Sequence, residues 1–163
     1  MIVNGWTLYF HPLFVDQVAR LIAGVERDRK KHPADYTRKS NAKLLNAIRT
    51  ITFDRIPQDP ADKRYRLGGT LGENHKHWFR DKFGNGRFRL FFRNDLRAKI
   101  IVYVWVNDET TLRTYGAKSD AYAVFASMLK EGNPPDGWDR LLDASKDPEV
   151  LKRAEEMLRT KPP

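Results

Sequence analysis

The sequence predicts an α+β fold in which an antiparallel β-sheet packs against helices. Apolar residues recur at helical spacing on both sides of the centre of the chain, and short aromatic and β-branched runs lie between them. Between two of these runs stands Gly84-Asn85-Gly86, a strong hairpin signal. The chain has 163 residues, 40% of them hydrophobic, which is enough for one core.

The first third of the chain is expected to form one strand and two helices. Residues 5–10 are the strand, and Pro12 lies in the first turn of a helix, where proline is tolerated. The apolar stripe of this helix is Phe14, Val18, Leu21, Ile22 and Val25. A second helix begins near Ala34 and ends before Pro57. Its stripe is Leu44, Leu45, Ile48 and Ile51.

The centre of the chain is expected to form four strands. They are residues 65–71, 77–83, 87–92 and 99–106. Alternate side chains of a strand share a face, so Phe88, Leu90 and Phe92 are expected to pack under the helices. The opposite face is expected to be open and to mix cations with aromatic rings. Its members are Arg80, Lys82, Arg87, Arg89, Arg93, Tyr103 and Trp105.

The C-terminal part is expected to be helical. Ser119 or Asp120 caps a helix that ends at Gly132, and Asp147 precedes the last helix. We assign residues 1–142 to one domain and residues 143–163 to a C-terminal helical extension.

Charge points to a polyanionic partner. The net charge is +9, and residues 76–99 alone carry eight Lys and Arg against two Asp. There is no cysteine, which excludes disulfides and thiolate metal sites. No apolar run is long enough to cross a bilayer, and the N-terminus lacks a basic signal-peptide start. We therefore expect a soluble cytoplasmic protein that does not contact membranes.

The basic and aromatic face suits single-stranded RNA. Cations hold phosphates, and aromatic or guanidinium planes stack on unpaired bases. RNA also carries its own nucleophile, the 2′-OH, which an enzyme needs only to align and to stabilise with positive charge. The alternative is an amphipathic strand with a solvated face. The pattern alone favours nucleic-acid binding over that alternative, and ranks cleavage below it.

His75 and His77 could bind a metal, but no third ligand is expected near them. Two polar histidines before a strand are more often part of a loop. We therefore predict no metal and no cofactor.

Several stretches resemble the YhaV-type toxins of bacterial toxin–antitoxin pairs. They are KFGNGRFRLFFR (82–93), NDETTLRTYGAKSDAYAVFASMLKEGNPPDGW (107–138), NGWTLYFHPLF (4–14) and RKSNAKLL (38–45). The resemblance covers about residues 3–140 and places the chain in the wider RelE-like superfamily, in which two helices precede an antiparallel sheet. It implies a ribosome-dependent mRNA endoribonuclease that uses no metal. It also implies an AbrB-like, PrlF-type swapped-hairpin antitoxin, with which the toxin binds operator DNA.

The resemblance also implies a catalytic set. The superfamily's pair of cations on one strand corresponds to Arg80 and Lys82, and its arginine on the next strand corresponds to Arg89. Its C-terminal arginine and tyrosine correspond to Arg113 and Tyr115. Lys82 would be the base or a transition-state cation, the arginines would hold the phosphate or the leaving oxygen, and Tyr115 would stack on a base. Expected RNA contacts are Arg87, Arg93, Lys118, Tyr103 and Trp105.

Two alternatives stay open. One is a non-catalytic module that binds RNA or the ribosome through the same basic face. The other is a gyrase-directed poison, because a sister branch of the superfamily has that target.

Arg89 is expected on the exposed face, so its replacement by alanine should change stability little.

Overall fold

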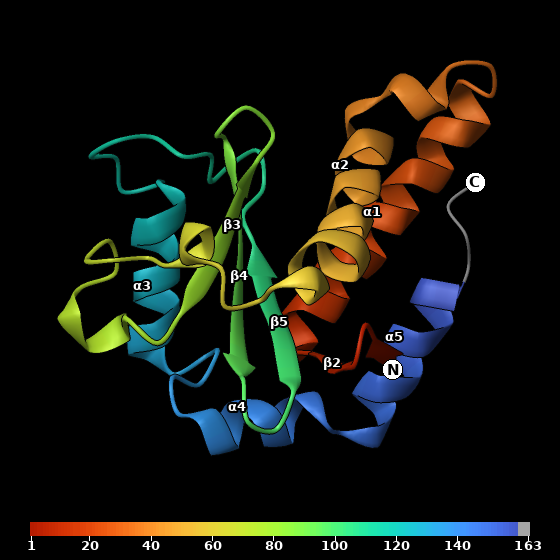
Figure 1. Ribbon diagram of the computed structural model, residues 1–163. Helices are drawn as coiled ribbons and strands as arrows, with labels where there is room; N and C mark the ends of the chain where they lie inside the picture. The colour runs from red at the N-terminus through yellow and green to blue at the C-terminus, as the bar shows by residue number, and fades with distance from the viewer. Residues whose placement is uncertain (160–163) are drawn as a thin grey trace.

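The structure is a computed structural model that describes residues 1–159, with side chains described up to Met157; the last four residues of the predicted extension lie outside it. It is α+β, as predicted (Figure 1). The strands are β1 (Ile2–Val3), β2 (Trp6–Phe10), β3 (Phe79–Phe83), β4 (Phe88–Asp95) and β5 (Ile100–Val106). The helices are α1 (Pro12–Lys31), α2 (Ser40–Thr50), α3 (Ala121–Glu131), α4 (Trp138–Ser145) and α5 (Pro148–Arg159). None of these helices is long and apolar enough to span a membrane.

The five strands form one sheet in the order β1-β2-β5-β4-β3. The β3–β4 hairpin is confirmed, and all three residues of its Gly84-Asn85-Gly86 turn have positive φ. The prediction of a wholly antiparallel sheet is wrong, because β2 pairs with β5 in parallel. Parallel neighbours need a long crossover connection, and α1, α2 and the β3–β4 hairpin all lie between these two strands in the sequence.

The strand predicted over residues 65–71 does not form. Lys63–Tyr65 is a 3-10 turn, and Arg66 makes only an isolated bridge to Phe79. Gly68 and Gly72 then adopt positive φ, which turns the chain repeatedly instead of extending it.

Helices cover both faces of the sheet. Helices α1 and α2 lie on one side, where Leu90 and Phe92 of β4 enter the larger core as predicted (Figure 1). The face predicted to be open is covered by α3, whose Phe125 stacks on Phe91 with ring centroids 4.1 Å apart. This second core buries most of the aromatic surface that the sequence pattern assigned to solvent.

A β-bulge changes which residues of β5 share a face. The register shifts between Phe91, which pairs with Trp105, and Phe92, which pairs with Tyr103. Tyr103 consequently joins the α1–α2 core, whereas Trp105 joins the α3 core. The prediction that both rings lie on one face is wrong, because strict alternation ends at the bulge.

The C-terminal helix packs on the rest of the molecule. Ala154 of α5 is buried in the larger core, and Arg153 forms an ion pair of 2.8 Å with Asp16 of α1. Helix α4 also runs across the predicted boundary between residues 142 and 143. The two-part division of the chain stays a prediction.

Candidate functional site

The N-terminus of α3 organises the site. Asp120 caps this helix, as predicted, by accepting the backbone N–H of Tyr122 at 3.0 Å. Its other oxygen accepts Nη1 of Arg113 at 2.6 Å and the backbone N–H of Thr114 at 2.7 Å. Burial alone would raise the pKa of Asp120, but the hydrogen bonds from these three residues lower it below its usual value. The carboxylate is therefore charged and holds Arg113 against α3.

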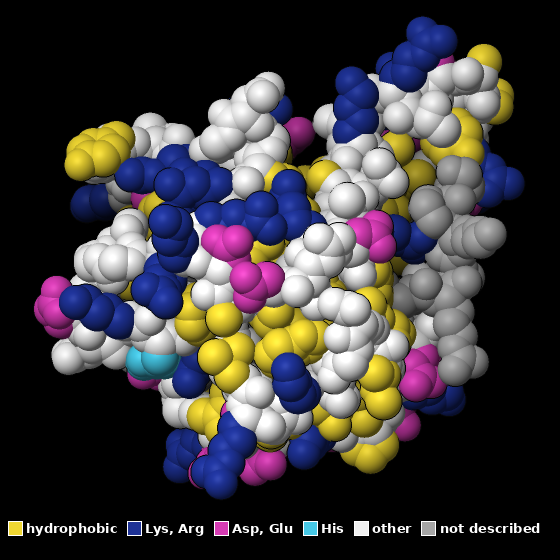
Figure 2. Space-filling view, viewed as in Figure 1, with side chains coloured by type: hydrophobic (Ala, Val, Ile, Leu, Met, Phe, Trp, Pro, Cys, Tyr) yellow, Lys and Arg dark blue, Asp and Glu magenta, His cyan; other side chains and the backbone are white. Residues whose placement is uncertain are grey.

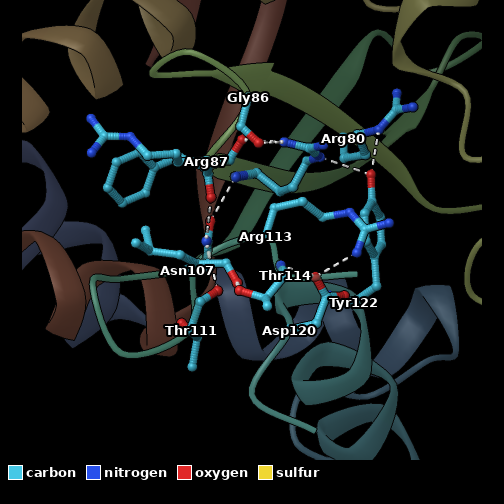
Figure 3. A network of polar contacts seen from close by, with 12 residues as sticks. Arg80, Gly86, Arg87, Asn107, Thr111, Arg113, Thr114, Asp120 and Tyr122 are labelled. Carbon is cyan, nitrogen blue, oxygen red and sulfur yellow. Dashed lines mark hydrogen bonds and ion pairs between the residues drawn. The ribbon is translucent and has the colours of Figure 1, made fainter. Parts of the chain in front are cut away.

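Three guanidinium groups surround one phenol (Figure 3). Nε of Arg80 on β3 and Nε of Arg89 on β4 each donate to the hydroxyl oxygen of Tyr122 at 2.9 Å. The Arg113 guanidinium lies 5.1 Å from the centroid of the same ring. We call Arg80, Arg89, Arg113 and Tyr122 the Tyr122 cluster.

The positive charge of this cluster is only partly neutralised. Within the described part of the chain, neither Arg80 nor Arg89 forms an ion pair with a carboxylate, although their side chains are only 7% and 6% exposed. Their Nη1 atoms donate to main-chain carbonyl groups. Among the described residues, the buried side-chain nitrogens that lack a partner are Nε of Arg49 and Nε of Arg55. The Nη2 atoms of Arg80 and Arg89 form no hydrogen bond among the described residues, and they are not among these fully buried atoms. Guanidinium N–H groups of this kind are the donors that bind oxyanions.

Asn107 fixes the loop that carries Arg113. Its side-chain oxygen accepts the backbone N–H of Arg89 at 2.6 Å, and its amide donates to the carbonyl oxygens of Arg87 and Thr111. The backbone N–H of Arg113 donates to the Arg87 carbonyl at 3.0 Å. These bonds hold the loop after β5 against the start of β4, and so place Arg113 near Arg89.

Four predicted residues lie exposed around the cluster. Lys82 is the strand partner of Arg89 in the β3–β4 register, and Arg87 follows the hairpin turn. Tyr115 is 93% exposed, with the Arg113 guanidinium 5.0 Å from its ring, and Lys118 follows on the same loop. Lys and Arg side chains gather over the upper half of this face of the molecule (Figure 2).

Three predicted RNA contacts are buried instead. Tyr103 lies in the α1–α2 core and donates its hydroxyl to the carbonyl of Thr52, and Trp105 packs under α3. Arg93 is 8% exposed and lies between the rings of Trp78 and Trp138, at 5.1 and 5.6 Å. Burial lowers the pKa of Arg93 to about 10. In this structure these three side chains build the core and do not offer a surface to RNA.

A groove lies beside the Tyr122 cluster and not within it. It has a volume of about 1020 Å³ and lies between α1, α2 and the β3–β4 turn. Arg87 lines it, whereas no member of the Tyr122 cluster does. The cluster and the groove thus flank the β3–β4 hairpin.

Two parts of the geometry were missed in the sequence. The sequence marks Tyr122 only as a plausible neighbour of the catalytic candidates, although its position two residues after the capping Asp120 places it in the first turn of α3, facing the sheet. Asp136 was not connected with His75 and His77, and the structure places its carboxylate within hydrogen-bonding distance of both rings. The argument that no third ligand is near them is therefore wrong.

Comparisons with known proteins agree with the resemblance. A family model described as a toxin with endonuclease activity, of a toxin–antitoxin system, matches residues 8–146. The chain is 47% identical over 140 residues to Ribonuclease toxin YhaV of Escherichia coli strain K12 and to Toxin YhaV of Escherichia coli O157:H7. Each alignment covers 85% of this chain and 91% of the relative. No solved structure matches. The chain belongs to the YhaV family of toxins with endonuclease activity from toxin–antitoxin systems.

Proposed function

We propose that this toxin is an endoribonuclease that cuts mRNA on the ribosome, without a metal ion, by attack of the 2′-OH on the adjacent phosphate. The observation that carries the proposal is the Tyr122 cluster, in which Arg80 and Arg89 both donate to one hydroxyl and, among the described residues, form no ion pair with a carboxylate. The relative named as a ribonuclease supports RNA as the substrate.

The cluster suits the charge that develops in this reaction. As the 2′-oxygen bonds to phosphorus, negative charge grows on the non-bridging oxygens, and Arg80 and Arg89 stabilise it. The bond to the 5′-oxygen then breaks, this oxygen takes a proton from water, and the products are a 2′,3′-cyclic phosphate and a 5′-OH. Arg113 donates to the phosphate or to the leaving oxygen. Lys82, opposite Arg89 in the strand register, takes the 2′-OH proton or adds positive charge.

Tyr122 acts as a positioning residue. Its hydroxyl accepts from both arginines, and so fixes the separation of their guanidinium groups before the substrate arrives. A site that is already arranged for the transition state loses little free energy to reorganisation.

Exposed residues around the cluster bind the rest of the RNA. Tyr115, held by Arg113, is placed to stack on an unpaired base. Arg87 and Lys118 contact neighbouring phosphates. A ribosome-bound substrate places the activity in the cytoplasm.

The partner in this proposal is an AbrB-like antitoxin of the PrlF type, and the complex binds operator DNA. An acidic antitoxin segment that covers Lys82 and Arg87 would occupy the phosphate-binding surface. Membership of a toxin–antitoxin family and the net charge of +9 both support such a partner.

The decisive experiment maps cleavage ends. The purified toxin is incubated with mRNA, with and without ribosomes, in the presence and absence of EDTA. We expect the mRNA to be cut only when ribosomes are present, and the new ends to carry 2′,3′-cyclic phosphate and 5′-OH. The same cuts should appear when EDTA is added after the ribosomes are assembled, in a buffer that keeps the ribosomes intact. Cleavage that yields a 3′-OH and 5′-phosphate, or that stops when a transition metal is removed, would refute the mechanism.

A further inference from the structure

Two loops that are distant in the sequence meet at one carboxylate. His75 and His77 precede β3, and Asp136 lies between α3 and α4. Oδ1 of Asp136 lies 3.1 Å from Nδ1 of His75 and 2.9 Å from Nε2 of His77. The three candidate ligand atoms all lie within 4.8 Å of one another. None of the three residues belongs to the Tyr122 cluster.

We propose that His75, His77 and Asp136 form a Zn²⁺ site. Zinc binds imidazole nitrogen and carboxylate oxygen at about 2.0–2.2 Å, so two ligands of one ion lie about 3–3.5 Å apart. The two measured separations from Asp136 approach that range. Two nitrogens and one oxygen suit zinc, whereas Mg²⁺ and Ca²⁺ prefer oxygen ligands alone.

The carboxylate is already held for this role. Nε1 of Trp78 donates to Oδ1 of Asp136 at 2.7 Å, and the backbone oxygen of Asp136 accepts Nη1 of Arg93 at 2.8 Å. Oδ2 of Asp136 accepts no hydrogen bond within the described part of the chain, so the carboxylate can bind an ion and keep the indole contact. Partners of this kind, behind the ligands themselves, orient a metal site and raise its affinity.

The ion also explains the crowding at Asp136. Without it, nitrogens of three rings converge on a single oxygen, because Nδ1 of His75, Nε2 of His77 and Nε1 of Trp78 all lie within 3.1 Å of Oδ1. With zinc bound, the two imidazoles present lone pairs to the metal, and only the indole N–H remains on the carboxylate. All three ligands are partly exposed, so water can complete the tetrahedron.

Zinc at this position would clamp the two loops around Arg93. It would join residues 73–77, which precede Trp78, to residues 133–137, which precede Trp138, and the rings of both tryptophans contact Arg93. The ion is then a stabilising clamp and not a participant in cleavage. Removing it should lower the unfolding temperature while cleavage persists below that temperature.

The test is zinc binding to the purified chain after chelator treatment. Isothermal titration with ZnCl₂ should show one saturable site, and zinc at about one hundred times its Kd should raise Tm by about 5–10 °C. MgCl₂ should raise Tm much less. His77→Gln should weaken zinc binding at least tenfold and remove the Tm increase, and so should Asp136→Asn, which keeps an oxygen for Trp78.

His32→Gln is the matched control, because His32 is an exposed histidine at the end of α1 and far from Asp136 in the sequence. It should bind zinc as the native chain does. The proposal is overturned if the native chain shows no saturable binding, or if the His75→Gln/His77→Gln double variant binds zinc equally well. Neither measurement uses RNA, so failure here leaves the proposed cleavage untouched.

Discussion

Arg89 and Arg93 lie on the same face of β4 and are almost equally buried, yet their surroundings differ. Arg89 donates to the Tyr122 hydroxyl and to carbonyl groups, and its Nη2 forms no hydrogen bond among the described residues. Arg93 lies between two indole rings and donates to the backbone oxygen of Asp136. Burial alone therefore does not separate a functional arginine from a structural one; the neighbouring groups do.

Electrostatics sharpens the contrast. The Arg93 guanidinium is attracted by Asp136, which raises its pKa against the larger lowering by burial. Arg80 and Arg89 share a neutral phenol and have no carboxylate in an ion pair within the described residues. Two like charges held close together repel each other, and a bound phosphate would relieve that repulsion. The Tyr122 cluster is thus suited to an anion that the folded chain itself does not supply.

The largest effect should follow from Arg89→Ala. Losing one arginine of the phosphate site should reduce ribosome-dependent cleavage by about 10²–10³-fold. Because Arg89 is buried, the substitution should also cost about 1–3 kcal/mol of stability by leaving hydrogen-bonding groups unpaired. This corrects the expectation from the sequence that the change is nearly neutral for stability. The measurements are primer extension on mRNA and denaturant unfolding.

Arg97→Ala is the control for Arg89→Ala. Arg97 is exposed in the β4–β5 turn, and replacing it by alanine lowers the net charge of the protein by the same one unit. It should retain cleavage and stability close to native. A folded Arg89→Ala protein with native cleavage would place the site elsewhere. Arg89→Lys should recover only part of the activity, because an ammonium cannot reproduce the two-pronged guanidinium contact with phosphate.

Tyr122→Phe tests whether the hydroxyl positions the arginines. The ring and its contact with Arg113 remain, while the acceptor shared by Arg80 and Arg89 is lost. We expect the cleavage rate to fall about 10- to 100-fold, as befits losing hydrogen bonds to charged groups. The loss should appear in the single-turnover rate more than in RNA affinity. If Tyr122→Phe weakens RNA binding 10- to 100-fold and leaves the single-turnover cleavage rate unchanged, then the hydroxyl does not position the two arginines.

Arg93→Ala should show the opposite pattern. Removing the guanidinium from between Trp78 and Trp138 should lower stability by about 2–3 kcal/mol, because each cation–π contact contributes about 0.5–2 kcal/mol. Thermal unfolding should then shift down by about 5–10 °C. Cleavage per folded molecule, measured well below Tm, should change by less than about threefold. If Arg93→Ala reduces cleavage per folded molecule as much as Arg89→Ala does, then Arg93 is not purely structural and the distinction between the two arginines is wrong.

Much of this arrangement follows from the sequence. The helical stripe of α1, the Gly84-Asn85-Gly86 turn and the capping Asp120 each depend on local rules, and the structure confirms all three. The β3–β4 face with Arg80 and Arg89 follows from strand alternation and is likewise confirmed by the register.

The remainder depends on contacts between distant segments. The bulge that separates Tyr103 from Trp105 leaves no local signal, because it comes from fitting β4 to β5. The covering of the predicted open face depends on where α3 returns to the sheet, which periodicity within α3 does not specify. For the same reason Asp136 could not be connected with His75, because they meet only when the loop after α3 packs beside β3.

The smallest total change in free energy should come from Asp120→Asn, which keeps an acceptor for the α3 cap but removes the charge that holds Arg113. We expect cleavage to fall by about fivefold, corresponding to about 1 kcal/mol of lost positioning. Because the pKa of Asp120 is lowered in the folded protein, its charge stabilises the fold above the unfolded pKa near 3.8. That stability is lost as pH falls through the lower folded pKa.

Unfolding experiments from pH 7 to below pH 4 should therefore show a shallower loss of stability for Asp120→Asn than for the native chain. Arg113→Ala should also reduce the dependence of stability on pH in part, because it removes one of the hydrogen bonds that lower the Asp120 pKa. If the native chain and Asp120→Asn lose stability in parallel, then Asp120 is not held as a buried anion by Arg113. The Arg113 guanidinium would then be held by its contacts with the rings of Tyr115 and Tyr122 and not by the Asp120 charge.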